Sequence, residues 1–232
     1  MQHTICFDTP MFESLRSAHP GWYIVLYIAG SLLFFMAIVI VIVFLLHERM
    51  TKYKEQDLKI FQQVHPLRTP ANNRIMLAIT FLGTHKFLIP ANLLLIGIFF
   101  FLSPHHYWYA FDILVLSLSS LLIMLLLKQL FGRARPETPL LFAAKGKSFP
   151  SGHAMMSVCF YGFLLHVLLQ SNIGTGLQIV MGIVCITLII LIGFSRVYLQ
   201  VHYLSDVVAG FVIGTAWLCL AVQAFNKLEV VV

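Results

Sequence analysis

Three short polar islands in an otherwise apolar chain carry the residue types that are needed to cleave a phosphate ester. Along the chain they are Lys128 with Arg135-Pro136, then Pro150-Ser151-Gly152-His153, and then Ser195-Arg196 with His202 and Asp206. Ionisable groups beside long apolar runs are costly to keep near a bilayer. Their accumulation at the ends of these runs therefore suggests a site with a chemical function.

Hydrolysis of a phosphate ester needs cations that hold the anionic oxygens, a nucleophile in line with the scissile bond and a proton for the departing alcohol. Lys128, Arg135 and Arg196 supply fixed positive charge, and guanidinium groups match phosphate oxygens in a bidentate way. Ser151 and the amide of Gly152 lie where a helix is expected to begin. Unpaired N–H groups and the positive end of the helix dipole favour an anion at that point.

His202 and Asp206 are four residues apart, which predicts that they share one face of a helix. A carboxylate in that position can accept the imidazole N–H and fix its tautomer. An imidazole oriented in this way can attack phosphorus, and the same carboxylate would stabilise the phosphohistidine that forms. His153 then remains as the proton donor to the departing oxygen.

The composition identifies the surroundings of these residues as a membrane. Of 232 residues, 59% are hydrophobic and only 10% are charged, which is far from the composition of a soluble domain. Six apolar runs are each long enough to span a bilayer: about 22–46, 75–103, 108–131, 152–170, 174–194 and 203–224. The sequence therefore predicts an all-α integral membrane bundle of about six transmembrane helices, forming one membrane-embedded domain over residues 1–232.

The second run is interrupted by the polar residues 83–86 and by Pro90. Its earlier half is expected to form a short interfacial helix, with the membrane part beginning near Phe87. The polar segment 47–74 precedes it, and an amphipathic interfacial helix is predicted around 57–64. We interpret this segment as a solvated connection that touches headgroups rather than as part of the catalytic site.

Arg133, the first arginine of the Arg-Ala-Arg stretch, is similarly interpreted as a headgroup contact or a solvated charge. Phe142, Phe149 and Tyr198 lie close to the islands in sequence and could line a groove for a lipid tail. Aromatic residues are common at membrane interfaces, so an interfacial belt is the simpler explanation.

The order of the crossings predicts that the islands meet on one side of the membrane. Lys128 and Arg135 follow the third run, residues 151–153 open the fourth, Arg196 closes the fifth and His202 opens the sixth. Alternating crossings place all of these positions on the same face.

Taken together, the islands resemble the three signature motifs of the type 2 phosphatidic acid phosphatase (PAP2) superfamily. The matching pattern is Lys128, six residues, Arg135-Pro136; Pro150-Ser151-Gly152-His153; and Ser195-Arg196, five residues, His202, three residues, Asp206. The motif core spans 128–206. The resemblance implies the following roles: phosphate binding by Lys128, Arg135, Ser151, Gly152 and Arg196, general acid catalysis by His153, nucleophilic attack by His202 and orientation of that nucleophile by Asp206.

The integral branch of this superfamily acts on phosphatidate, phosphatidylglycerophosphate, undecaprenyl diphosphate or phosphorylated lipid A. The resemblance thus implies hydrolysis of a lipid phosphomonoester or diphosphate through a phosphohistidine, in the cell membrane and without a metal or other cofactor. The expected partners are a phosphorylated lipid substrate and membrane lipids. No nucleic acid is expected, because the net charge of +6 is interleaved with the spans, and no obligate protein partner is inferred.

Two other functions fit some of the same residues. A metal-dependent hydrolase could use His153, His202 and Asp206 as ligands, although three neighbouring cations would repel the metal. A lipid transporter or binding scaffold could retain the anion pocket without turnover. Orientation is also open: the positive-inside count favours a cytoplasmic site, whereas the family resemblance implies an extracytoplasmic one with both termini inside, and we follow the resemblance.

Overall fold

The computed structural model describes residues 55–102, 107–137, 139–140 and 146–231, and in addition the two isolated helical positions 30 and 37. Every regular element in these ranges is a helix, as predicted. After a helix over residues 55–64, the elements are η1 His65–Leu67, α3 Pro70–Phe81, α4 His85–Gly97, the π-helical η2 Ile98–Leu102, α5 Tyr107–Phe131, α6 Gly152–Gln170, α7 Thr175–Tyr198 and α8 Leu204–Val231. The first apolar run, 22–46, lies outside the described residues.

Four of these helices, α5 to α8, are long and apolar enough to cross a membrane, and α3 with α4 and part of η2 forms a fifth span if the bent pair counts as one. They correspond to the second to sixth predicted runs. Large apolar side chains such as Leu118, Leu122 and Ile183 point outwards and are 59%, 58% and 60% exposed. Such a surface suits contact with lipid chains.

The bend between α3 and α4 is 42° and lies where the sequence predicts an interruption. Gly83 is at the break, and a Cβ atom added there would lie 2.6 Å from Cγ2 of Ile192 and 3.3 Å from Cδ2 of His153. Only a residue without a side chain allows the break to pack this closely. The bent pair therefore lies directly against α7 and the start of α6.

Helix α6 is at the centre of the bundle and packs against α5, α7 and α8. Two glycines bring α8 close to the backbone of α6: a Cβ on Gly210 would lie 2.7 Å from the carbonyl oxygen of Ser151, and one on Gly214 would lie 3.0 Å from that of Met155. Small residues at such crossings are typical of membrane helices, because association there depends on close packing. The first turns of α6 and α8 are thus held together.

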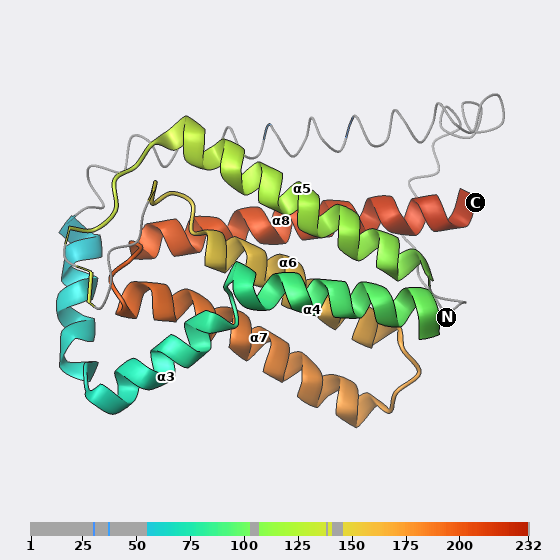
Figure 1. Ribbon diagram of the computed structural model, residues 1–232, viewed down its shortest axis with the longest axis horizontal. Helices are drawn as coiled ribbons and strands as arrows, with labels where there is room; N and C mark the ends of the chain where they lie inside the picture. The colour runs from blue at the N-terminus through green and yellow to red at the C-terminus, as the bar shows by residue number, and fades with distance from the viewer. Residues whose placement is uncertain are drawn as a thin grey trace.

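All of the motif-bearing helix ends lie on the same side of the bundle. Figure 1 shows the carboxyl ends of α5 and α7 beside the amino ends of α6 and α8, at the left of the view, with the helix over residues 55–64 next to them. This arrangement confirms the prediction made from the order of the crossings.

Candidate active site

The motif residues come from four helix ends and the loop before α6, and the innermost of them are almost inaccessible to solvent. Ser151 and Asp206 are fully buried, His202 is 2% exposed and Arg196 is 4% exposed. The ring of His153 is within electrostatic range of Arg196, His202, Arg135 and Lys128. The structure therefore brings the three sequence motifs into one cluster.

Arg135 determines which nitrogen of His202 carries a lone pair. Its Nη1 lies 3.1 Å from His202 Nε2 and also donates to the carbonyl oxygen of Val201 at 2.8 Å. A guanidinium group can only donate hydrogen bonds, so Nε2 must accept. The neutral imidazole then carries its proton on Nδ1, and its lone pair on Nε2 is directed toward the guanidinium of Arg135.

The pairing of His202 with Asp206 differs from the predicted one. Helix α8 begins at Leu204, so His202 lies in the turn before the helix rather than within it. Nδ1 of His202 is 3.6 Å from Oδ2 of Asp206, which is too long for a hydrogen bond. Catalytic hydrogen bonds are often this long without substrate and shorten in the reacting complex.

The carboxylate of Asp206 is held by several other groups. Its Oδ2 accepts hydrogen bonds from the hydroxyl of Ser148 and, at 3.0 Å, from the amide N–H of Tyr203, while its Oδ1 lies 2.6 Å from Nη1 of Arg133. Both oxygens are thus fixed by groups that hold the carboxylate beside His202.

Burial lowers the pKa of His202 to about 4. Arg135 and Arg196 lower this pKa further, whereas Asp206 opposes the shift. The imidazole is therefore unprotonated at neutral pH, which a nitrogen nucleophile requires.

Several buried polar atoms of the cluster have no hydrogen-bond partner within the described part of the chain: Ser151 Oγ, His153 Nε2, Arg196 Nε and His202 Nδ1. Buried polar atoms are normally paired, so each such atom requires an explanation. Arg196 uses one arm of its guanidinium to donate to Thr80 Oγ1 at 2.6 Å, and Lys128 donates to the carbonyl oxygen of Lys147 at 2.9 Å. An anion with several oxygens would satisfy the unpaired groups of Ser151, His153 and Arg196, whereas Nδ1 of His202 is directed toward Asp206.

Sequence reasoning missed two charged residues of this region. Arg133 is not a solvated charge: its side chain is 9% exposed and forms ion pairs with Asp206 and Asp57. Asp57 belongs to the polar connection that we interpreted as solvated, yet it is 3% exposed. It shares the buried face of its helix with Phe61 and Val64, and an acidic residue at that spacing was the signal available in the sequence.

The aromatic belt is also not observed for the two aromatics that the structure describes. Phe149 and Tyr198 are each 1% exposed and pack inside the protein, whereas Phe142 lies outside the described residues. In the same ranges, no three His, Cys, Asp or Glu side chains gather as metal ligands. That arrangement gives no support to the metal-dependent alternative.

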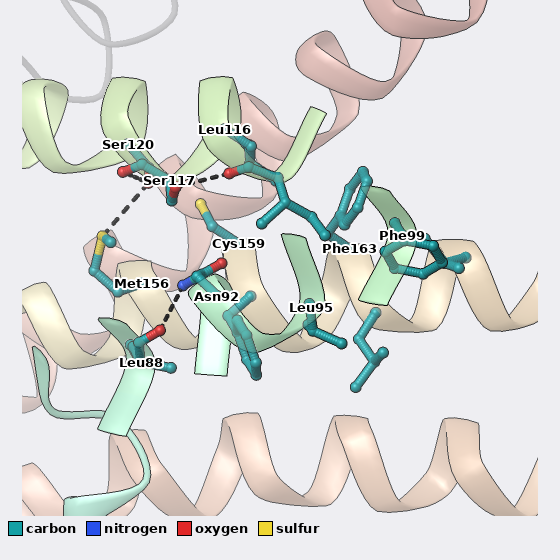
Figure 2. Close-up of a pocket in the computed structure, with 14 residues that line it drawn as sticks. Leu88, Asn92, Leu95, Phe99, Leu116, Ser117, Ser120, Met156, Cys159 and Phe163 are labelled. Carbon is teal, nitrogen blue, oxygen red and sulfur yellow. Dashed lines mark hydrogen bonds between the residues drawn. The ribbon is translucent and has the colours of Figure 1, made fainter. Parts of the chain in front are cut away.

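A pocket lies between α4, α5 and α6, and Figure 2 shows its predominantly apolar lining with a few hydroxyl, amide and thiol groups. The cavity itself is small, about 20 Å³, and it opens into about 450 Å³ of space between the side chains that includes the surroundings. Its lining along α6 runs from Met156 to Val167, about 16 Å of helix by the rise per residue. It therefore begins one helical turn beyond His153.

Comparison with known proteins identifies the family. The model of the PAP2 superfamily matches residues 109–229, which is more than half of the chain and includes all three motifs. The chain belongs to the PAP2 superfamily. The enzymatic alternative is thereby favoured over a non-catalytic transporter or scaffold: the protein is a multi-pass membrane lipid phosphatase of the PAP2 type.

Individual PAP2 proteins extend this similarity. Phosphatidylglycerophosphatase B of Bacillus subtilis is 32% identical over 167 residues, covering 69% of this chain and 78% of that protein. The crystal structure of a transmembrane PAP2 phosphatidylglycerolphosphate phosphatase from Bacillus subtilis is 28% identical with a TM-score of 0.72, covering 87% of this chain and 97% of that one. Aquifex aeolicus LpxE shares the fold, with 22% identity and a TM-score of 0.57 over 73% of this chain and 94% of its own.

The depressed pKa of His202 predicts how PAP2 activity depends on pH. An unperturbed histidine would protonate near pH 6.5, whereas a pKa of about 4 keeps the His202 imidazole neutral through mildly acidic conditions. We expect the acidic limb of kcat/KM, corrected for substrate ionisation, to lie well below pH 6. An acidic limb of kcat/KM near pH 6.5 would contradict a depressed pKa of His202.

Proposed function

We propose that the protein removes the terminal phosphate of phosphatidylglycerophosphate, with His202 as the nucleophile. The observation that carries this proposal is the contact between Arg135 and Nε2 of His202, because it directs the lone pair of a neutral imidazole toward the cationic cluster. The relatives named as phosphatidylglycerophosphatases support the choice of headgroup.

In the proposed reaction the phosphate replaces the contact between Arg135 and His202. Its oxygens are bound by the groups that lack a partner or face the cluster: Lys128, Arg135, Arg196, the hydroxyl of Ser151 and the amide of Gly152. The cations offset the charge of the phosphate in a site with little water, where preorganised donors are most effective.

Nε2 of His202 then attacks phosphorus, so that a P–N bond forms while the P–O bond to glycerol breaks. His153 enters the step as the imidazolium, which the bound phosphate anion favours, and gives its proton to the departing glycerol oxygen, while Asp206 stabilises the positively charged phosphohistidine. In the second step His153 takes a proton from water, the water oxygen attacks phosphorus and the P–N bond breaks. Inorganic phosphate leaves and His202 returns to its neutral form.

This function is tested by phosphate release from purified protein supplied with phosphatidylglycerophosphate, phosphatidate, undecaprenyl diphosphate or lipid A. We expect phosphatidylglycerophosphate to give the highest kcat/KM. His202→Ala should reduce every activity by about a thousandfold or more, because it removes the attacking atom, and Asp206→Asn should reduce it less. Residual hydrolysis close to the wild-type rate in the His202 variant would overturn the proposed nucleophile.

We further propose that one acyl chain of the substrate occupies the pocket between α4, α5 and α6. The pocket lies within the membrane-spanning helices and begins one turn from His153, so a lipid whose phosphate is at the cluster can place a tail there. Its apolar lining matches a hydrocarbon chain.

A pair of neighbouring substitutions on α5 tests this placement. Ser117 lines the pocket, whereas Leu118 points outwards and is 59% exposed. Ser117→Phe should lower kcat/KM for a long-chain lipid by about tenfold, because the tail leaves the pocket and headgroup alignment is lost. A short-chain phosphate ester and the Leu118→Phe control should be unaffected, and equal losses in both variants would contradict the proposal.

We place the active site on the extracytoplasmic face of the cell membrane, with both termini in the cytoplasm. The lysine and arginine residues at the motif end are engaged in the site, as the contacts of Lys128, Arg133, Arg135 and Arg196 illustrate. They therefore weigh less in the positive-inside count than free loop charges. A phosphatase or fluorescent reporter fused after Val232 should report a cytoplasmic end, and an extracytoplasmic signal would reverse this orientation.

A further inference from the structure

A chain of buried charges connects the helix over residues 55–64 to Asp206. The guanidinium of Arg133 lies between two carboxylates: Nη1 is 2.6 Å from Oδ1 of Asp206 and Nη2 is 3.0 Å from Oδ2 of Asp57. All three side chains are nearly inaccessible, with exposures of 9% for Arg133, 4% for Asp57 and 0% for Asp206. The fork of an arginine suits such a bridge, since its nitrogens reach two partners in fixed geometry.

Asp57 also holds the beginning of α8. Its Oδ1 accepts a hydrogen bond from the amide of Ser205 at 3.2 Å and its Oδ2 accepts one from the Ser205 hydroxyl at 2.7 Å. The first amides of a helix lack partners within the helix, and a carboxylate there satisfies them and complements the dipole. Asp57 therefore caps, from another element, the helix that carries Asp206.

Tyr203, in the turn before α8, makes a second contact with Arg133. Tyr203 lies under the guanidinium, with the arginine Cζ 4.0 Å from the ring centroid. Phe61 stacks on the other side of this pair, with its ring centroid 5.8 Å from that of Tyr203. Because Asp57 and Phe61 are one helical turn apart, they share one face of the helix. That face holds Arg133 directly through Asp57 and indirectly through the ring of Tyr203.

The position of Arg133 has a consequence for His202. A fully buried carboxylate without a cation is costly, and a neighbouring imidazole can relieve that cost by taking up a proton. The charged groups that act on His202 are Asp206, which favours its protonated form, and Arg135 and Arg196, which oppose it, while His153 faces it from α6. Arg133 neutralises Asp206 on the side away from the imidazole, so the carboxylate can orient His202 without protonating it.

We propose that Arg133 and Asp57 are positioning residues for the reaction: Asp57 holds Arg133, and Arg133 fixes the carboxylate of Asp206 beside the nucleophile. Neither residue needs to touch the substrate. The inference rests on the proposed role of His202, and it makes the helix over residues 55–64 a functional part of the active site.

The test compares Arg133→Gln, Arg133→Lys and Asp57→Asn in the purified full chain, with phosphatidylglycerophosphate in mixed micelles. Glu55→Gln is the matched control, because Glu55 is an exposed carboxylate on the same helix. For each variant we would measure kcat, KM, the pH dependence of kcat/KM, thermal unfolding and the affinity for vanadate, a phosphate mimic.

Arg133→Gln should lower kcat by about tenfold to a hundredfold, the range expected for strongly coupled neighbours, while KM and vanadate affinity change by about twofold or less. The acidic limb of its kcat/KM profile should move to higher pH, because Arg133 no longer offsets the charge of Asp206, which favours protonation of His202. Asp57→Asn should shift kcat and the limb in the same direction by less. Arg133→Lys should recover part of the activity, since an ammonium reaches one carboxylate only.

A folded Arg133→Gln protein with the kcat and pH profile of wild type would overturn the inference. If that variant does not fold, Asp57→Asn and Arg133→Lys provide the test instead. An acidic limb of kcat/KM at the wild-type pH in both of these variants would also overturn the inference. Wild-type protein that fails to hydrolyse any lipid phosphate would instead refute the proposed function. The Glu55→Gln control should match wild type in every measurement, and a shift there as large as in Asp57→Asn would also count against a specific role for Asp57.

Discussion

The active site depends on keeping the carboxylate of Asp206 ionised while it is fully buried. Such a group is stable only when cations and hydrogen-bond donors surround it, and here they come from separate parts of the chain. Arg133 and Ser148 belong to the loop after α5, and the amide of Tyr203 belongs to the turn before α8. The network that holds one carboxylate thus fixes the relative positions of the elements that form the site.

The membrane requires apolar helix surfaces, whereas phosphate chemistry requires charged and polar side chains. The outer surfaces of α5 and α7 are apolar and suit lipid, so the polar groups must gather at the helix ends and satisfy one another there. The gathering is not complete, since polar atoms of Ser151, His153 and Arg196 lack partners in the described ranges. A phosphate brought from the lipid phase would complete the set, and the adjacent apolar pocket is the site that we propose for its tail.

The sequence was sufficient to predict the helical membrane fold, the break near Gly83 and the convergence of the motifs, because these follow from the length of the apolar runs and the parity of the crossings. It could not reveal the partners of Asp206. The contact between Arg133 and Asp206 joins residues 73 positions apart, and charge alone does not distinguish a solvated arginine from a buried one. Helical spacing also misplaced His202, which lies in the turn before α8 and therefore approaches Asp206 less closely than predicted.

In the proposed reaction, Nε2 of His202 becomes covalently attached to phosphorus. The most direct measurement is to mix the protein with phosphatidylglycerophosphate labelled in its terminal phosphate, stop the reaction within the first turnover and locate the label by peptide analysis. We expect a phosphohistidine at His202 that forms and decays at rates compatible with kcat. Label on another residue, or complete turnover in a His202→Ala protein, would contradict it.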